Sequence, residues 1–308
     1  MNLLLDDHGN FLIAIQGRSK NTVISYRRDL EQFFQFLLSR FKLSDETNAI
    51  QLIDLDLLLT LTQSDIYAYI SYTTFKLNNS ESSRKRKIAA IRSLYHYLSV
   101  GLHKEFKNPT SDIELPKIKK RTPAHMTLDE SLSLLNAIEG KFKERDYAII
   151  TIFLNCGLRL SELTSLKIED IQDEVMHIIG KGNKERLIFL NDACVNALTN
   201  YLKKRSNEID TPYVFLNRFN KKISNRGVEL LVEKHLNKAG LDTTKFSVHK
   251  LRHTAATLMY QYGEVDIRTL QKILGHENLT TTEIYTHVED SLVQNALYKN
   301  PLANKTQA

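Results

Sequence analysis

The chain has 308 residues, of which 42% are hydrophobic and 25% are charged, and its formal net charge is +6. This length suits about two domains of ordinary size. No stretch is long and apolar enough to span a bilayer, and the N-terminal segment MNLLLDDHGN carries acids where a secretory signal has a basic flank, so we expect a cytoplasmic protein. The two cysteines form no CxxC pair, which argues against a zinc ribbon, a redox motif and a disulfide framework.

The first third of the chain predicts mostly helical structure. Apolar residues recur at three- and four-residue steps over residues 23–37, which makes one amphipathic face. Ser19 or Thr22 can cap the start of this helix. Two further helices are predicted over about 64–77 and 82–99, each with an apolar inner face.

A cluster of basic residues lies on the first turns of the helix predicted over 82–99. It comprises an unbroken run and one arginine further on: Arg84, Lys85, Arg86, Lys87 and Arg92. The helix dipole disfavours cations near an N-terminus, so the cluster indicates a polyanionic partner such as a phosphate backbone. A solvated face is the alternative interpretation of such a run.

Residues 106–125 contain three of the five prolines in the chain and several lysines. Proline blocks a helix and stiffens an extended segment, so this stretch predicts an interdomain linker. The division that follows is a helical domain over 1–105, the linker over 106–125, and a second domain over 126–308 that ends in a helical tail.

The second half mixes helices with one hairpin. Thr127 and Glu130 fit a capping box, and a helix over about 143–156 ends at Cys156, expected as a small core residue, and Gly157, expected as a left-handed cap. Strands are predicted on both sides of a glycine-rich turn, over 175–180 and 185–190. Further helices are predicted over about 192–206, 226–239, 248–262, 266–274 and 280–286, and an apolar stripe follows within 289–299.

Arg159 and the segment around Arg252 are candidate anion sites. Arg159 follows a helix-ending glycine in apolar surroundings, where an anion or a salt bridge to Glu162 could hold it. His249 and Arg252 lie about one helical turn apart and project from one face. His253 is also one turn from His249, which permits a zinc interpretation, but Arg252 on the same face would repel a cation. The remaining alternative is that both histidines are core residues whose ring nitrogens are hydrogen-bonded within the protein.

Three more polar residues stand beside glycines or helix boundaries. Lys181 lies on the predicted hairpin, which lacks the spacing and the following helix of a nucleotide-binding P-loop. His276 follows Gly275, and Tyr285 lies nine residues beyond that histidine. A lone tyrosine is usually a half-buried core residue, so Tyr285 gains meaning only together with the other segments.

Four segments in order carry a resemblance to a known family. They are GLRLSEL at 157–163, GKGNKERLIFL at 180–190, HKLRHTAATL at 249–258 and LGHENLTTTEIYTHV at 274–288. Together they resemble the tyrosine recombinase, or phage integrase, family and most closely its Xer-like branch. The resemblance implies a mainly α fold, with a helical core-binding domain over 1–105 that binds DNA. The catalytic domain over 126–308 is then mixed α/β, mostly helical with a small antiparallel sheet.

The resemblance also assigns the site. The six catalytic positions are Arg159, Lys181, His249, Arg252, His276 and Tyr285, and Glu162 supports the first of them. In this pattern Arg159 and Arg252 grip the scissile phosphate, and Tyr285 is the nucleophile. The basic cluster of residues 84–92 belongs to the DNA-binding part of the core-binding domain.

These residue types suit strand transfer at a phosphodiester. Two arginines can neutralise the charge that develops on the phosphate oxygens, so neither a metal nor another cofactor is expected. His249 suits the base, Lys181 the proton donor to the leaving 5′ oxygen, and His276 a hydrogen bond to the phosphate. A 3′-phosphotyrosyl bond keeps the bond energy, so no ATP is implied.

The expected partner is double-stranded DNA. From the resemblance we expect a homo-tetramer, or a hetero-tetramer with a paralogue, on two DNA sites, with the tail docking in cis or in trans. Two alternatives share parts of the pattern: a type IB topoisomerase, and a DNA-binding regulator without catalysis. The sequence leaves open whether the role is chromosome dimer resolution or integration and excision of a mobile element.

Overall fold

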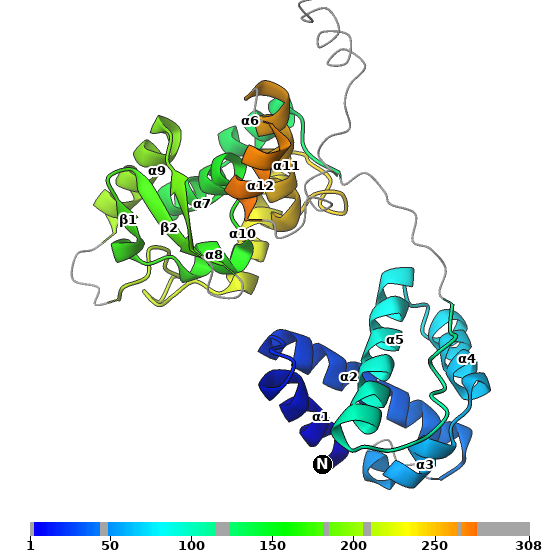
Figure 1. Ribbon diagram of the computed structural model, residues 1–308. Helices are drawn as coiled ribbons and strands as arrows, with labels where there is room; N and C mark the ends of the chain where they lie inside the picture. The colour runs from blue at the N-terminus through cyan, green and yellow to red at the C-terminus, as the bar shows by residue number, and fades with distance from the viewer. Residues whose placement is uncertain are drawn as a thin grey trace, which may run out of the picture. The chain divides into compact units, whose positions relative to one another are not determined.

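The computed structural model describes residues 3–43, 49–114, 124–180, 185–205, 211–263 and 266–275. The chain divides into two compact units, Met1–Lys120 and Arg121–Ala308 (Figure 1). Each unit has its own hydrophobic core. The described residues are mostly helical and contain one three-stranded antiparallel sheet, so the predicted fold class is confirmed. Among the described helices, none has the length and apolarity needed to cross a membrane.

The first unit is helical throughout its described elements. They are α1 (Leu3–Ala14), α2 (Lys20–Arg40), η1 (Ala49–Leu52), α3 (Leu55–Thr60), α4 (Gln63–Ser71), η2 (Tyr72–Lys76), α5 (Glu81–His96) and η3 (Tyr97–Gly101). The predicted helices over 23–37, 64–77 and 82–99 correspond to α2, α4 with η2, and α5 with η3. The Ser19 hydroxyl accepts a hydrogen bond from the Thr22 backbone at 3.2 Å, so Ser19 caps α2.

Aromatic packing fixes how these helices meet. Phe33 of α2 and Tyr69 of α4 form an edge-to-face pair with ring centroids 4.9 Å apart, and both are fully buried. Tyr95 of α5 is also buried, and its hydroxyl donates to the Leu58 carbonyl at 2.9 Å. A buried tyrosine hydroxyl needs such a partner, so this bond lets Tyr95 lie in the core that α2, α3, α4 and α5 share.

The second unit surrounds one buried helix. Its described elements are α6 (Leu128–Asn136), α7 (Lys143–Cys156), α8 (Leu160–Ser165), η4 (Ile168–Asp170), β1 (Ile171–Gln172), β2 (Val175–Ile179), β3 (Glu185–Phe189), α9 (Asp192–Lys204), α10 (Asn225–Lys238), α11 (Val248–Tyr262) and α12 (Ile267–Leu274). α7 packs against both α9 and α11, and every residue from Ala148 to Leu154 is buried. A helical stretch that is apolar on nearly all sides belongs inside the core, as this part of α7 does.

The predicted hairpin and the expected core cysteine are both confirmed. β2 and β3 pair antiparallel with Ile179 opposite Glu185, and the turn between them lies outside the described residues. Cys156 is 3% exposed, and its sulfur lies 3.7 Å from that of buried Cys194 on α9. Both cysteines are free thiols.

Candidate active site

Arg159 owes its position to the way α7 ends. Gly157 caps the helix in the left-handed conformation, with φ at 59°, as the sequence predicts. A Cβ at this position would lie 2.9 Å from Cδ2 of Leu274, which ends α12, so glycine also permits the close approach of the two helix ends. The chain then turns, and Arg159 becomes the N-cap residue of α8.

Glu162 is the centre of the cluster. Its buried carboxylate accepts hydrogen bonds from the Arg159 backbone at 2.7 Å and from the Arg159 guanidinium at 2.8 Å. Arg186 of β3 adds a bidentate pair at 2.9 and 2.8 Å. Burial alone would raise the pKa of Glu162, but the hydrogen bonds from Arg186 and Arg159 outweigh it and lower the pKa to about 2. Glu162 is therefore ionised throughout the physiological range.

The salt bridge weighed as an alternative for Arg159 is present, but it uses only part of the guanidinium. Nη2 of Arg159 donates to the Gly275 carbonyl at 2.9 Å, and the side chain remains 34% exposed. The arginine thus connects the start of α8 with the end of α12 while part of it still faces solvent. Such an arginine is held in place and can accept an anion.

Arg252 of α11 reaches the same place from another direction. It is buried, and its guanidinium donates to the carbonyls of Gly157 and Leu274, the ends of α7 and α12. One of its nitrogens lies 4.0 Å from the Glu162 carboxylate. Carbonyls at a helix C-terminus carry partial negative charge, which stabilises the buried cation.

The charge balance of the cluster favours an anion. Three guanidinium groups, those of Arg159, Arg186 and Arg252, surround the single carboxylate of Glu162, so two positive charges remain uncompensated by it. Arginine forks match the oxygens of a phosphate. In the ranges that the structure describes, no group of three His, Cys, Asp or Glu side chains could hold a metal ion.

The two histidines of α11 differ in their surroundings. His249 is exposed on the first turn, one turn before Arg252. His253 is half-buried, and its pKa falls to about 4, chiefly through burial and then through the nearby charges of Lys250 and Arg252. His253 is thus neutral at pH 7, and the positive surroundings of the pair do not suit the zinc interpretation.

Three predicted catalytic residues, Lys181, His276 and Tyr285, lie outside the described residues. The structure therefore brings together Arg159, Glu162 and Arg252 and places His249 on the same helix as Arg252. Arg186 is a member that the sequence prediction missed. Its signal was its place on the strand that follows the glycine-rich turn, but its partners come from segments far away in the sequence.

In the first unit, part of the basic run serves the fold. Lys87 is 8% exposed, and its ammonium donates to the side chains of Gln32 and Asp29 on α2. Arg86 pairs with the same Asp29, although 45% of its side chain is exposed. Lys87 therefore joins α5 to α2, and we do not include it among the residues proposed to contact DNA.

The other basic residues of α5 lie closer to the surface. Arg84 and Lys85 are half-buried, and Arg84 donates to the Thr74 hydroxyl at 2.9 Å. Arg92 is exposed and donates to the Ile113 carbonyl at 2.6 Å. These contacts anchor the side chains and leave Arg84, Lys85, Arg86 and Arg92 as candidates for an anionic partner.

A second basic surface, missed by the sequence prediction, lies at the start of α10. Residues 217–226, called the basic turn, comprise a turn and the first two residues of α10, and the Asn217 side chain accepts from the Phe219 backbone at 2.8 Å. The guanidinium of Arg218 lies over the Phe219 ring at 4.6 Å. The exposed cations of this basic turn are Arg218, Lys221 and Arg226. They escape notice in the sequence because other residue types separate them.

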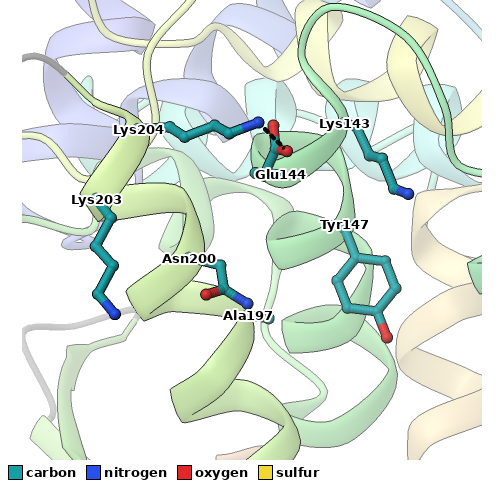
Figure 2. A pocket seen from close by; sticks show the side chains of 7 residues that line it. All are labelled: Lys143, Glu144, Tyr147, Ala197, Asn200, Lys203 and Lys204. Carbon is teal, nitrogen blue, oxygen red and sulfur yellow. Dashed lines mark hydrogen bonds and ion pairs between the residues drawn. The ribbon is translucent and has the colours of Figure 1, made fainter.

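Figure 2 shows a pocket at the other end of α7, with a volume of about 670 Å³. It is lined by Lys143, Glu144, Tyr147, Ala197, Asn200, Lys203 and Lys204. Lys204 is paired with Glu144. Of the predicted catalytic residues that the structure describes, none lines this pocket, and it lies by the first turn of α7, whereas Arg159 follows the last. We therefore do not assign it to the cleavage site.

Comparison with known proteins gives family matches for both units of the chain. Residues 124–291 match the phage integrase family, and residues 5–100 match the phage integrase N-terminal SAM-like domain. The tyrosine recombinase XerC of Caldanaerobacter subterraneus is 48% identical over 98% of this chain and 88% of its own length. The tyrosine recombinase XerD of Rickettsia bellii is 32% identical over 95% of this chain and 96% of its own length.

Solved structures agree on the fold. The XerH site-specific recombinase, in a post-cleavage complex with its palindromic difH substrate, matches with a TM-score of 0.68 and 22% identity, over 96% of this chain and 95% of that one. The lambda integrase tetramer bound to a Holliday junction matches with a TM-score of 0.67 and 19% identity, over 90% of this chain and 77% of that one.

Proposed function

Since the chain belongs to the phage integrase family and is a Xer-like tyrosine recombinase, we propose that it cuts and rejoins double-stranded DNA at specific sites through a covalent phosphotyrosine. One observation of the structure carries the assignment of the site. Arg159 and Arg252, which lie 93 positions apart, converge on the buried carboxylate of Glu162 and leave an excess of positive charge.

The two arginines suit the electrostatic part of the reaction. Their guanidinium groups bind the non-bridging oxygens of the scissile phosphate and stabilise the charge that develops there during attack. The fixed acceptors of each arginine, at Gly275 for Arg159 and at Leu274 for Arg252, hold both groups in place before DNA binds. Groups held in place in this way need little reorganisation during the reaction.

The remaining roles rest on the family pattern. The oxygen of Tyr285 attacks the phosphorus, the bond to the 5′ oxygen breaks, and a 3′-phosphotyrosyl bond forms. His249 takes the tyrosine proton, Lys181 gives a proton to the leaving 5′ oxygen, and His276 donates a hydrogen bond to the phosphate. The 5′ hydroxyl of another strand then reverses these steps on a new partner.

Both units bind DNA in this proposal. The core-binding domain over 1–105 uses Arg84, Lys85, Arg86 and Arg92, and the catalytic domain over 126–308 adds the basic turn of residues 217–226. The linker over 106–125 joins them. Contacts with phosphates supply most of the affinity, so binding weakens steeply as salt rises.

The assembly that we propose is a tetramer on two DNA sites, made of four copies of the chain or of copies together with a paralogue. In this assembly the tail, with its apolar stripe within 289–299, docks in cis or in trans. The lambda integrase tetramer bound to a Holliday junction, a structure with the same fold, supports this assembly. The chain acts on DNA in the cytoplasm.

Cleavage of a nicked suicide duplex tests the proposal. The duplex carries the site found by footprinting the chain on its host's DNA. The nick lies near the cleavage position, so the short fragment that bears the new 5′ hydroxyl diffuses away after cleavage. We expect a covalent adduct with the natural chain and none with Tyr285→Phe, which still binds the duplex. Binding of the duplex without an adduct would indicate a DNA-binding regulator. Relaxation of a supercoiled plasmid that lacks the site would indicate a type IB topoisomerase.

A further inference from the structure

Arg186 of β3 contacts both Glu162 and the end of α12. Its side chain is 11% exposed and forms the bidentate pair with Glu162 at 2.9 and 2.8 Å. Its Nε donates to the Ile273 carbonyl at 3.1 Å. It also lies against Gly275, where an added Cβ would be 3.2 Å from the Arg186 Cδ and Nη1 atoms.

These contacts join three separate segments. Glu162 belongs to α8, Arg186 belongs to β3 directly after the hairpin turn, and Ile273 and Gly275 end α12. The hairpin turn carries Lys181, and His276 follows Gly275 in the sequence. The Arg186 guanidinium is therefore bonded to Glu162 on α8 and to the end of α12, while the Arg186 backbone belongs to the hairpin.

We propose that Arg186 is a positioning residue for DNA cleavage, which holds the Glu162 carboxylate, and through it the Arg159 guanidinium, against the end of α12. The inference rests on the proposed recombinase function. Arg186 itself touches no reacting group in this account. Its effect on the reaction is exerted through Glu162 and through the backbone of Ile273 and Gly275.

The geometry requires an arginine at this position. Both oxygens of Glu162 are shared, since Oε1 accepts from the side chains of Arg159 and Arg186, and Oε2 accepts from the Arg159 backbone and from Arg186. A lysine would keep the charge, but one ammonium cannot reproduce two parallel bonds to Glu162 and a third to Ile273. The Glu162 carboxylate would then lose one of its two arginine partners, so it and the Arg159 guanidinium would be held less firmly.

A purely structural role is the competing explanation, and the chain offers a matched control. Arg145 has a side chain that is 12% exposed, and it donates to Asp146 at 2.9 and 2.8 Å and to the Leu216 carbonyl at 3.0 Å. Arg145 thus also pairs with a buried carboxylate and a backbone carbonyl, although both of its bonds to Asp146 go to one oxygen. Arg145→Lys should cost folding stability much as Arg186→Lys does, without a specific effect on cleavage.

The experiment measures single-turnover cleavage of the suicide duplex by the full chain with Arg186→Lys or Arg145→Lys. Because small displacements of catalytic groups can cost ~10²-fold in rate, we expect Arg186→Lys to cleave roughly 10- to 100-fold more slowly. Its affinity for the uncleaved duplex should stay unchanged. Arg145→Lys should cleave at the natural rate at temperatures where it is folded.

A pH profile separates positioning from folding. Among the described residues, the charged groups that face Glu162 are the side chains of Arg159, Arg186 and Arg252. Without Arg186 the pKa of Glu162 moves upward, because burial raises it and one opposing partner is gone. The cleavage rate of Arg186→Gln relative to the natural chain should therefore fall further as the pH is lowered from 7 to 5.

Three results would overturn the inference: Arg186→Lys cleaving at the natural rate, a pH-independent rate ratio for Arg186→Gln, or normal cleavage by Glu162→Gln. The last variant leaves Arg186 intact and covers the case in which Arg186 variants do not fold. Failure of the natural chain to form any adduct is a different outcome, since it refutes the recombinase function itself.

Discussion

Replacing Gly157 by alanine tests the junction on which the site is built. Gly157 combines a φ of +59° with an approach so close that a Cβ would lie 2.9 Å from Cδ2 of Leu274. The left-handed conformation costs an alanine ~1–2 kcal/mol. Leu274 is fully buried and packs with Ala256 and Leu270, so it cannot move away freely, and overpacking of this kind costs ~1–3 kcal/mol.

The two costs add to a loss of ~2–5 kcal/mol in the free energy of unfolding. For a unit of this size, each kcal/mol lowers the melting temperature by about 2–4 °C, so Gly157→Ala should melt at least ~4 °C below the natural chain. Thermal unfolding followed by circular dichroism measures the shift.

Gly240→Ala is the matched control. Gly240 has a φ of +70°, and an added Cβ would meet nothing within 4 Å, so this variant carries the backbone cost of ~1–2 kcal/mol alone. The difference between the two variants isolates the contact with Leu274. If Gly157→Ala lost no more stability than Gly240→Ala, the close packing of the α7 and α12 ends would be refuted.

Two further outcomes follow from the charges. The pKa of Glu162, about 2 in the folded chain, lies below its unfolded value of about 4.3, so its contribution to stability is present above that value and is lost as the pH falls towards 2. Glu162→Gln should therefore show a shallower loss of melting temperature between pH 5 and 2. In the basic turn, replacing Arg218 and Arg226 by glutamine should reduce the salt dependence of DNA binding by about one unit of slope per lost phosphate contact. The same change at Lys203 and Lys204, by the pocket of Figure 2, should leave that slope unaltered.

Much of the helical framework could be predicted because its ends carry local signals. Ser19, the capping box of Thr127 with Glu130, and the left-handed Gly157 each act on backbone groups within a few residues. The predicted bounds of α7 and α11 match the structure for the same reason. The helices α3 and α8 were missed, since a helix of six residues shows little periodicity, and the 12-residue α1 was missed as well.

Contacts between distant segments could not be predicted. In the basic run, Lys87 looks like its neighbours, yet it lies four residues before buried Ile91 and so faces the core, where Asp29 and Gln32 of α2 receive it. The helical periodicity could have predicted that Lys87 faces the core, unlike its basic neighbours, but the sequence does not reveal its partners. Arg186 likewise depends on Glu162 and Ile273, which only the fold brings near it.

The most direct test of the account is to identify the covalent bond itself. The adduct with the suicide duplex is trapped, digested with protease and nuclease, and sequenced by mass spectrometry. The account predicts one modified peptide, in which the oxygen of Tyr285 is joined through a phosphate to the 3′ oxygen of a nucleotide. A modification at another residue, or a linkage to a 5′ oxygen, would contradict it.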